Sequence, residues 1–174
     1  MHPLTRLIYA SKASFKRHRR DTGIDLEVGR ILGQSRRNNP RLEIGGVLYY
    51  GDGHFFQVLE GPREAVQDLY RQIIEDPRHT SSTILSSEHI EQRLFDDWSM
   101  KYIPAERAIR SQLAAAGHPQ FDPFAFDHAM IQHMVHLLHE GLNANPESGL
   151  ASLVRGGWKR LWLRLRLGGG DAAR

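Results

Sequence analysis

Residues 44–60 have the sequence IGGVLYYGDGHFFQVLE, in which Gly51-Asp52-Gly53 separates two apolar runs. Glycine adopts positive φ without steric cost, so this separator predicts a tight turn between strands at 44–50 and 54–60. Apolar side chains fall on both faces of each run, whereas a strand with one face in water alternates apolar and polar residues. We therefore expect a β-hairpin that is covered on both sides.

Apolar periodicity extends the fold outward from this hairpin. Helical spacing predicts one helix from Thr22, as its cap, to about Arg36, which Asn38-Asn39-Pro40 ends. It predicts a second helix that Pro62 opens and that ends near Asp76-Pro77. The residues of this second helix expected to face inward are Val66, Leu69, Tyr70, Ile73 and Ile74. The order strand, helix, strand, strand, helix, strand, strand favours an open α+β sheet of about five strands with two helices on one face. The further strands are expected at 4–11, 83–88 and 98–103.

Residues 105–174 are predicted to form a helical extension after a domain at 1–104. A connector rich in Pro, Gly and Ala is expected at 104–123, followed by helices at 124–142 and 148–167. The last helix is basic and amphipathic, which suits a membrane surface, an acidic partner or the protein's own surface. Packing on the domain or on a sister subunit is the favoured interpretation.

Composition excludes several classes of protein. The 174 residues contain no cysteine, which excludes a disulfide scaffold, a thiolate nucleophile and a cysteine metal site. The net charge of +3 is too small to argue for a nucleic-acid partner, and no apolar run is long enough to span a bilayer. The N-terminus lacks a signal-peptide pattern, so a cytoplasmic protein is expected.

Four histidines in the predicted helix at 124–142 raise the question of a metal site. Their spacings of three and five residues can bring some of them to one face of the helix. No cluster of carboxylates accompanies them, so hydrated surface or interface histidines are favoured over zinc and no metal is predicted. These histidines are His128, His133, His136 and His139.

Gln57 stands out because it lies in the middle of an apolar strand, with Phe55 and Leu59 on its face. Burying an amide without partners costs roughly 1–3 kcal/mol, so Gln57 needs partners within the core or a ligand. Other residues of interest are Tyr9, Asn38, Asn39, Arg78, His79, Trp98 and Met100. Taken singly, each is explained by core packing, helix termination or solvent exposure. Together they offer a phenol, amides and a guanidinium without a nucleophile–base pair, which favours a planar ligand with polar edges over a hydrolytic site.

Six segments resemble, in order and spacing, the BLUF domains, which are sensors of blue light that use FAD. The segments are LIYAS (7–11), RNN (37–39), IGGVLYY (44–50), FFQVLEG (55–61), DPRH (76–79) and WSM (98–100). The resemblance covers about residues 4–103 and implies a ferredoxin-like mixed sheet with FAD held between the two helices. The sequence departs from the family at Gly45, where BLUF domains usually have threonine.

The resemblance also implies a role for individual residues, by motif position. The photoactive switch would comprise Tyr9, Gln57, Trp98 and Met100. The FAD-binding residues would be Ile31, Asn38, Asn39, Gln57, Arg78 and His79. Under blue light, Tyr9 would pass an electron and then a proton toward the flavin, and their return would leave Gln57 with changed hydrogen bonds. No covalent bond to the flavin forms in this scheme, in agreement with the absence of cysteine.

The resemblance therefore implies a photoreceptor rather than an enzyme. The segment 105–174 is too short for a cyclase or phosphodiesterase domain, which favours the short stand-alone type. Such a protein would signal through a downstream partner or a homo-oligomer formed by the C-terminal helices. Two alternatives are a flavin-independent ferredoxin-like module that binds a partner, and a small hydrolase of the acylphosphatase type. The hydrolase is disfavoured because the first loop lacks that family's phosphate-binding arginine pattern.

Overall fold

The computed structural model describes residues 3–15, 25–96, 100–103 and 107–143. Contacts divide the chain into one unit of Met1–His139 and a second of Glu140–Arg174, and the description below concerns the first. The helices and strands are β1 (Leu4–Ala13), α1 (Leu26–Asn38), η1 (Asn39–Leu42), β2 (Gly45–Gly51), β3 (His54–Pro62), α2 (Arg63–Glu75), β4 (His79–Ile90), β5 (Lys101–Ile103), α3 (Arg107–Ala115), η2 (Pro123–Ala125) and α4 (His128–Asn143). Helix α4 crosses the division between the two units, and its bounds are those of the whole helix.

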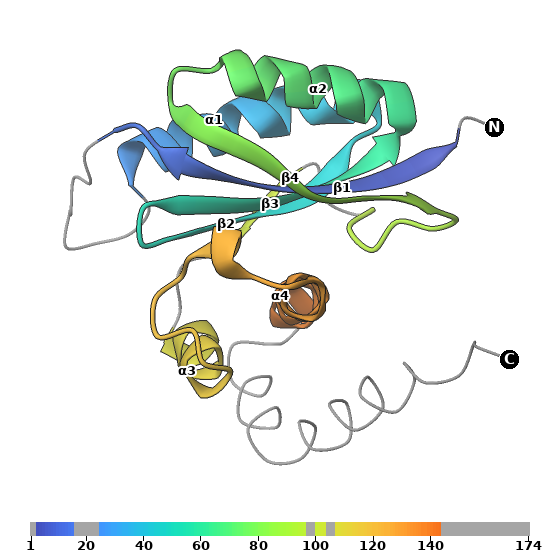
Figure 1. Ribbon diagram of the computed structural model, residues 1–174. Coiled ribbons are helices and arrows are strands. Elements are labelled where there is room, and N and C mark those ends of the chain that lie inside the picture. Colours follow the sequence, from blue (N-terminus) through green and yellow to red (C-terminus); the bar gives the residue numbers. More distant parts are fainter. Residues whose placement is uncertain (1–2, 16–24, 97–99, 104–106, 144–174) are drawn as a thin grey trace, which may run out of the picture. The chain divides into compact units, whose positions relative to one another are not determined.

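The sheet has five strands in the order β4-β1-β3-β2-β5. β1 runs antiparallel to β3 and β4, and β2 runs antiparallel to β3 but parallel to β5. Figure 1 shows α1 and α2 on one face of this sheet, with α3 and α4, up to His139, on the other. The predicted α+β fold, a mixed five-stranded sheet with two helices on one face, is confirmed.

The β2–β3 hairpin has the geometry that its glycines predict. Gly51 pairs with His54, and the two residues between them, Asp52 and Gly53, both have positive φ, at 46° and 80°. A two-residue turn with positive φ at both positions has a backbone twist that matches the right-handed twist of the flanking strands. Every residue of β2 is buried, which confirms that the hairpin is covered on both sides.

The start of α1 differs from the sequence prediction. Asp25 is the N-cap, and its carboxylate accepts a hydrogen bond of 3.0 Å from the amide of Glu27. The prediction of Thr22 as the cap was wrong, because an aspartate nearer the first apolar turn meets the free amides there and its charge favours the helix N-terminus. The end of α1 at Asn38, just before Pro40, is as predicted.

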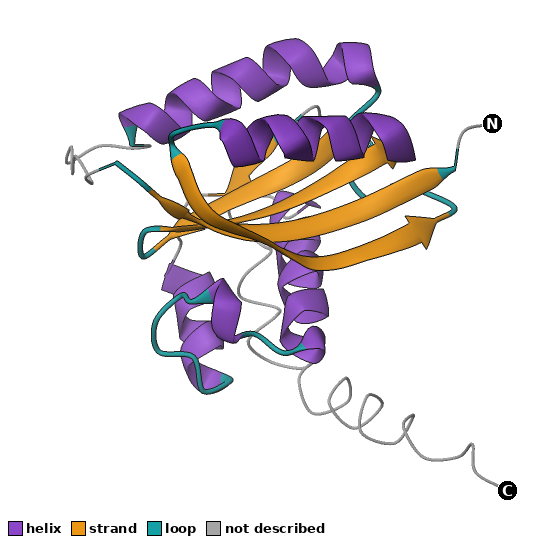
Figure 2. Cartoon of the chain, turned by 45° about the horizontal axis from the view of Figure 1, so that its top comes forward, coloured by secondary structure: helices purple, strands orange, loops and turns teal. Residues whose placement is uncertain are grey.

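The second helix packs through a narrower face than predicted. α2 begins at Arg63 after Pro62, and Val66 and Tyr70 are buried as expected. Ile74, which helical spacing placed toward the core, is 50% exposed. Figure 2 shows α1 and α2 side by side above the strands.

The C-terminal half of the described chain shows further differences in length. β4 is longer than the predicted strand at 83–88, and β5 begins at Lys101 rather than at 98. The predicted connector contains α3, and α4 begins at His128, just after Asp127, whose carboxylate accepts a hydrogen bond of 2.8 Å from the Met130 amide in the first turn. The predicted helix at 148–167 lies outside the described residues, and the domain boundary at 104/105 stays a prediction. Within the described part, no helix is both long and apolar enough to cross a membrane.

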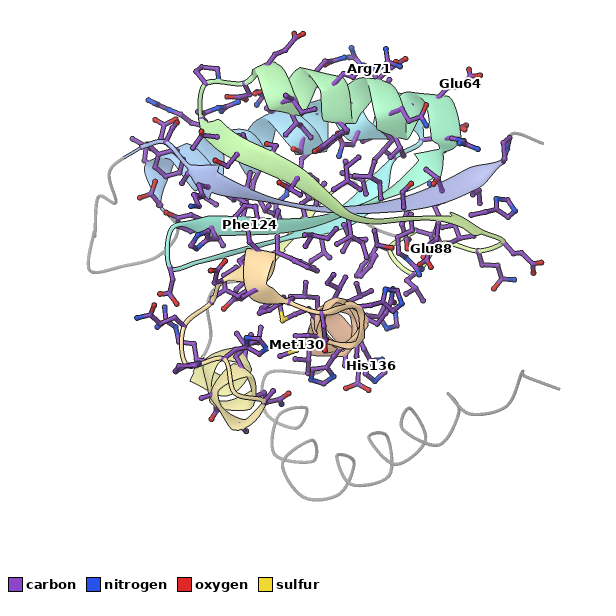
Figure 3. All side chains as sticks on the ribbon, in the orientation of Figure 1. Glu64, Arg71, Glu88, Phe124, Met130 and His136 are labelled. Atoms are coloured by element: carbon purple, nitrogen blue, oxygen red, sulfur yellow. The ribbon has the colours of Figure 1, made fainter. Side chains whose placement is uncertain are left out.

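Each face of the sheet has its own apolar core. The core under α1 and α2 comprises Leu7, Tyr9, Val28, Ile31, Leu32, Ile44, Leu48, Tyr50, Phe55, Leu59, Val66, Tyr70 and Met100. On the other face, the Phe121 ring packs edge-on against Tyr49 at 4.7 Å and the Phe95 ring against His139 at 5.8 Å. Phe124 and Met130 belong to the segments that cover this second face (Figure 3).

Candidate functional site

A chain of hydrogen bonds crosses the core under α1 and α2. Tyr9 on β1 and Gln57 on β3 are register partners, and the Tyr9 hydroxyl donates to Gln57 Oε1. Gln57 Nε2 in turn donates to the Met100 sulfur, 3.2 Å away. All three side chains are buried. The amide that the sequence singled out therefore has a partner at each end, and it can reverse only by exchanging its donor with its acceptor.

Tyr9 is held in its protonated form by its surroundings. Burial, followed by the nearby Tyr70 and Asp76, raises the pKa of Tyr9 well above its ordinary value. The ring of Tyr70 on α2 lies 5.2 Å from that of Tyr9. Tyr70 was predicted only as a core residue, because helical spacing shows which face of α2 is inward but not which strand residue it meets.

The end of α1 supplies two more of the predicted residues. Ile31 belongs to the core under the helices, and Asn39 is buried where α1 passes into η1. The backbone of Asn39 is fixed on both sides, since its amide donates to the Ser35 carbonyl and its carbonyl accepts from Ile44. Asn38 is exposed, so the structure buries only one of the two predicted asparagines.

His79 opens β4 and points into the core. Its Nδ1 shares a hydrogen bond of 2.9 Å with the Ser11 hydroxyl, and its ring lies 4.7 Å from that of Phe55. Burial lowers the pKa of His79 to about 4, against an opposing effect of Asp76. The imidazole is therefore neutral at neutral pH. Ser11 was seen in the sequence only as part of the first strand.

Arg78 lies at the edge of a groove of about 450 Å³ along α1. Its guanidinium donates to Gln34 Oε1 at 2.9 Å and pairs with Asp76, whose pKa is lowered by the hydrogen bonds from Arg78. The groove is lined by Asp25, Leu26, Gly29, Arg30, Gly33, Gln34, Arg37 and Arg78. The spacing of Gly29, Gly33 and Gln34 along a helix is a sequence signal that could have found this groove.

Two further predictions concern Trp98 and a metal site. Trp98 lies outside the described residues, so the structure does not place it. Over the ranges that the structure describes, no group of three or more His, Asp or Glu side chains could hold a metal ion.

Comparison with known proteins supplies the family. Residues 4–101, more than half of the chain, match the family described as BLUF, sensors of blue-light using FAD. The chain belongs to the BLUF family. For residues 4–101, the prediction of a blue-light sensor that uses FAD, a sensor rather than a catalyst, is thereby confirmed.

Curated relatives share this region with the chain. The photoactivated adenylate cyclase subunit beta of Euglena longa is 36% identical over 98 residues, which are 56% of this chain and 11% of the relative. The blue light- and temperature-regulated antirepressor BluF of Escherichia coli K12 is 35% identical over 98 residues, again 56% of this chain and 23% of the relative. The chain thus spans less than a quarter of the length of these relatives.

Solved structures agree with the fold over a larger part of the chain. The photo-activated state of BlsA matches with a TM-score of 0.69 and 32% identity, over 78% of this chain and 94% of that one. The dark state of the BLUF protein BlrB matches with a TM-score of 0.61 and 32% identity, over the same shares.

The residues present fit FAD, the cofactor of the family. A flavin ring is planar with a polar edge, and Gln57 and Asn39 supply buried amides that can both donate and accept. The groove beside α1 adds Arg30, Arg37 and Arg78, which suit the phosphates of a dinucleotide.

Proposed function

We propose that the protein reports blue light through a rearrangement of the hydrogen bonds between Tyr9 and Gln57 next to bound FAD. The observation that supports this proposal is the buried chain from the Tyr9 hydroxyl through the Gln57 amide to the Met100 sulfur. Each end of the amide has a different partner, so its orientation is a two-state variable that a small change can bias.

Five residues are assigned to holding the cofactor with Gln57. Asn39 would bind the C4 carbonyl and N3 at the polar edge of the ring, and Ile31 would pack on its face. Arg78 would lie near the C2 carbonyl, with His79 beside it at the ring. Asn38 and Trp98 keep roles in the site and the switch by motif position alone. When bound, FAD supplies the absorption of blue light and a reversible acceptor for an electron.

The residues of the chain account for the switch itself. Tyr9 carries a proton on its hydroxyl and directs it at Gln57 Oε1. If the Gln57 amide reverses, its oxygen faces the Met100 sulfur, and a thioether can accept a hydrogen bond but cannot donate one. The Gln57–Met100 hydrogen bond exists in only one of the two orientations, so Met100, next to β5, senses the state of Gln57.

Signalling through a protein partner or a homo-oligomer is part of the same proposal, with sensing in 1–104 and output through 105–174. The relatives support a variable output, since one is named as a cyclase subunit and another as an antirepressor. Contact of the basic C-terminal helix with a membrane surface is disfavoured relative to these protein contacts.

The test is the visible spectrum of protein purified in dim light, recorded before and after blue illumination. The expected result is a flavin spectrum that shifts slightly to the red and recovers in darkness. Gln57→Leu should keep the flavin and lose the shift, whereas Gln67→Leu, at an exposed position on α2, should behave as the wild type. A colourless protein that takes up no added FAD would instead support the flavin-independent module.

A further inference from the structure

Glu60 is a fully buried carboxylate on β3 that the proposed switch does not use. It lies three residues after Gln57, so strand alternation places the two side chains on opposite faces of the sheet. Burying a carboxylate is costly unless it is paired and hydrogen-bonded, so the contacts of Glu60 identify what it holds in place.

Each carboxylate oxygen of Glu60 has its own partner. Oε1 accepts a hydrogen bond of 2.6 Å from Arg6 Nε on β1, the register partner of Glu60. Oε2 accepts one of 2.9 Å from the backbone amide of Phe95, in the segment between β4 and β5. The Arg6 guanidinium compensates the buried charge, and a hydrogen bond from an amide to a charged acceptor is stronger than one to a neutral acceptor.

The segment that Glu60 holds leads directly to Met100. Phe95 is fully buried, and five residues later Met100 receives the hydrogen bond from Gln57. The Met100 carbonyl also accepts a hydrogen bond of 3.1 Å from Arg36 Nε on α1. β3 therefore contacts Phe95 through Glu60 and Met100 through Gln57, while Arg36 on α1 holds the Met100 carbonyl.

We propose that Glu60 is a positioning residue of the photoswitch, which fixes Phe95 and thereby helps to set the position of Met100, whose sulfur meets the Gln57 amide. This inference rests on the proposed function. Return of the Gln57 amide from its reversed orientation requires it to turn against Met100, so a firmly held Met100 slows the return. Releasing Phe95 lowers this barrier and shortens the lifetime of the light-adapted state.

Glu60→Gln separates the two contacts of the carboxylate. A glutamine has one amide oxygen, and the charged Arg6 competes for it more strongly than the Phe95 amide. The glutamine NH₂ then faces the Phe95 N–H, two donors that cannot bond, so Phe95 is released while the bond to Arg6 remains. The matched control is Glu88→Gln on the edge strand β4, where Figure 3 labels Glu88. Glu88 also pairs with Arg6, at 2.9 Å.

The experiment measures the half-life of dark recovery in the FAD-loaded full chain for the wild type, Glu60→Gln and Glu88→Gln. Glu60→Gln should shorten the half-life at least about threefold, whereas Glu88→Gln should leave it within about 1.5-fold of the wild type. An unchanged or lengthened half-life in Glu60→Gln, or an equal change in both variants, overturns the proposal and leaves Glu60 as part of a core ion pair.

Two further measurements keep the result interpretable. Amide hydrogen exchange in darkness should be faster at Phe95 in Glu60→Gln than in Glu88→Gln, and equal exchange overturns the inference even if the wild type shows no photocycle. A wild type without a light-induced shift refutes the proposed function instead. If Glu60→Gln does not fold, Arg36→Gln, at an exposed position, releases the Met100 carbonyl and should also shorten the half-life. An unchanged half-life in that variant overturns the proposal.

Discussion

Tyr9 and Gln57 are coupled at the scale of single residues, because each is the other's buried partner. Tyr9→Phe leaves Gln57 Oε1 without its donor, which should cost about 1–3 kcal/mol in the free energy of unfolding. Removing both polar groups in Tyr9→Phe/Gln57→Leu should cost at least about 0.5 kcal/mol less than the sum of the single changes. Urea denaturation of the FAD-free protein measures this cycle, and strictly additive effects would show that the bond contributes nothing.

His79 gives the protein a predictable dependence of stability on pH. Its pKa in the folded state is about 4, below the ordinary 6.5, so the unfolded chain binds more protons between these values. The contribution of His79 is fully present above pH 6.5 and is lost as the pH falls toward 4, by up to about 3 kcal/mol.

This prediction can be checked by urea denaturation at pH 7.5 and pH 5. The FAD-free wild type should lose more stability between these values than His79→Gln. His136→Gln, at an exposed position on α4, should keep the pH dependence of the wild type. The same loss in the wild type and in His79→Gln would assign the effect to other groups.

Sequence reasoning at this scale found the residues whose chemistry was out of place, and missed those whose chemistry was ordinary. Gln57 in an apolar strand implied a partner, and Tyr9 and Met100 are its partners. Glu60 ends the same apolar strand, yet its role became visible only with Arg6 and Phe95, which are far away in the sequence. Long-range contacts of this kind leave no periodic signal.

At the scale of elements, two glycines should respond in opposite ways to a single methyl group. A Cβ at Gly46 on β2 would lie 2.1 Å from the Val58 carbonyl oxygen on β3, so the strands would have to separate. Gly46→Ala should therefore destabilise the protein by about 3 kcal/mol or more. A Cβ at Gly33 on α1 would meet only the Arg37 side chain at 3.5 Å, and alanine favours the helix by up to about 1 kcal/mol.

Urea denaturation of the FAD-free variants measures both effects. The expected order of midpoints is Gly33→Ala, wild type, Gly46→Ala. A Gly46→Ala midpoint within error of the wild type would mean that β2 and β3 can move apart at no cost, against the contact that the backbone shows.

Element prediction succeeded where the local pattern was strong. The turn at Asp52-Gly53 and the end of α1 before Pro40 follow from backbone chemistry alone. α3 was missed inside a connector rich in Pro, Gly and Ala, because short helices depend on tertiary packing for their stability. Its buried Ile109 and Leu113 supply that packing, which the sequence of the segment does not announce.

At the scale of the whole molecule, the sheet needs cover on both faces. Tyr49 contacts Phe121 and Phe95 contacts His139, so residues after the predicted boundary at 104/105 bury side chains that come before it. The compact unit that contains the sheet extends to His139. Sensing and output can be separate in function, as the proposed division has it, and still depend on each other for stability.

A fragment of residues 1–104 should therefore be far less stable than one of residues 1–143. Without α3, η2 and α4, the fragment exposes apolar side chains on the second face of the sheet, namely Ile8, Val47, Tyr49, Phe56 and Val58. Large apolar side chains each stabilise a fold by about 1.5–3 kcal/mol when buried, so their joint exposure approaches the whole stability of a domain, about 5–15 kcal/mol. Size-exclusion chromatography and urea denaturation should find the 1–104 fragment associated or unfolded, and the 1–143 fragment with a cooperative transition close to that of the full chain. A monomeric 1–104 fragment with the same urea midpoint as 1–143 would show that the second face needs no cover, and that the chain divides at 104/105 in stability as well as in function.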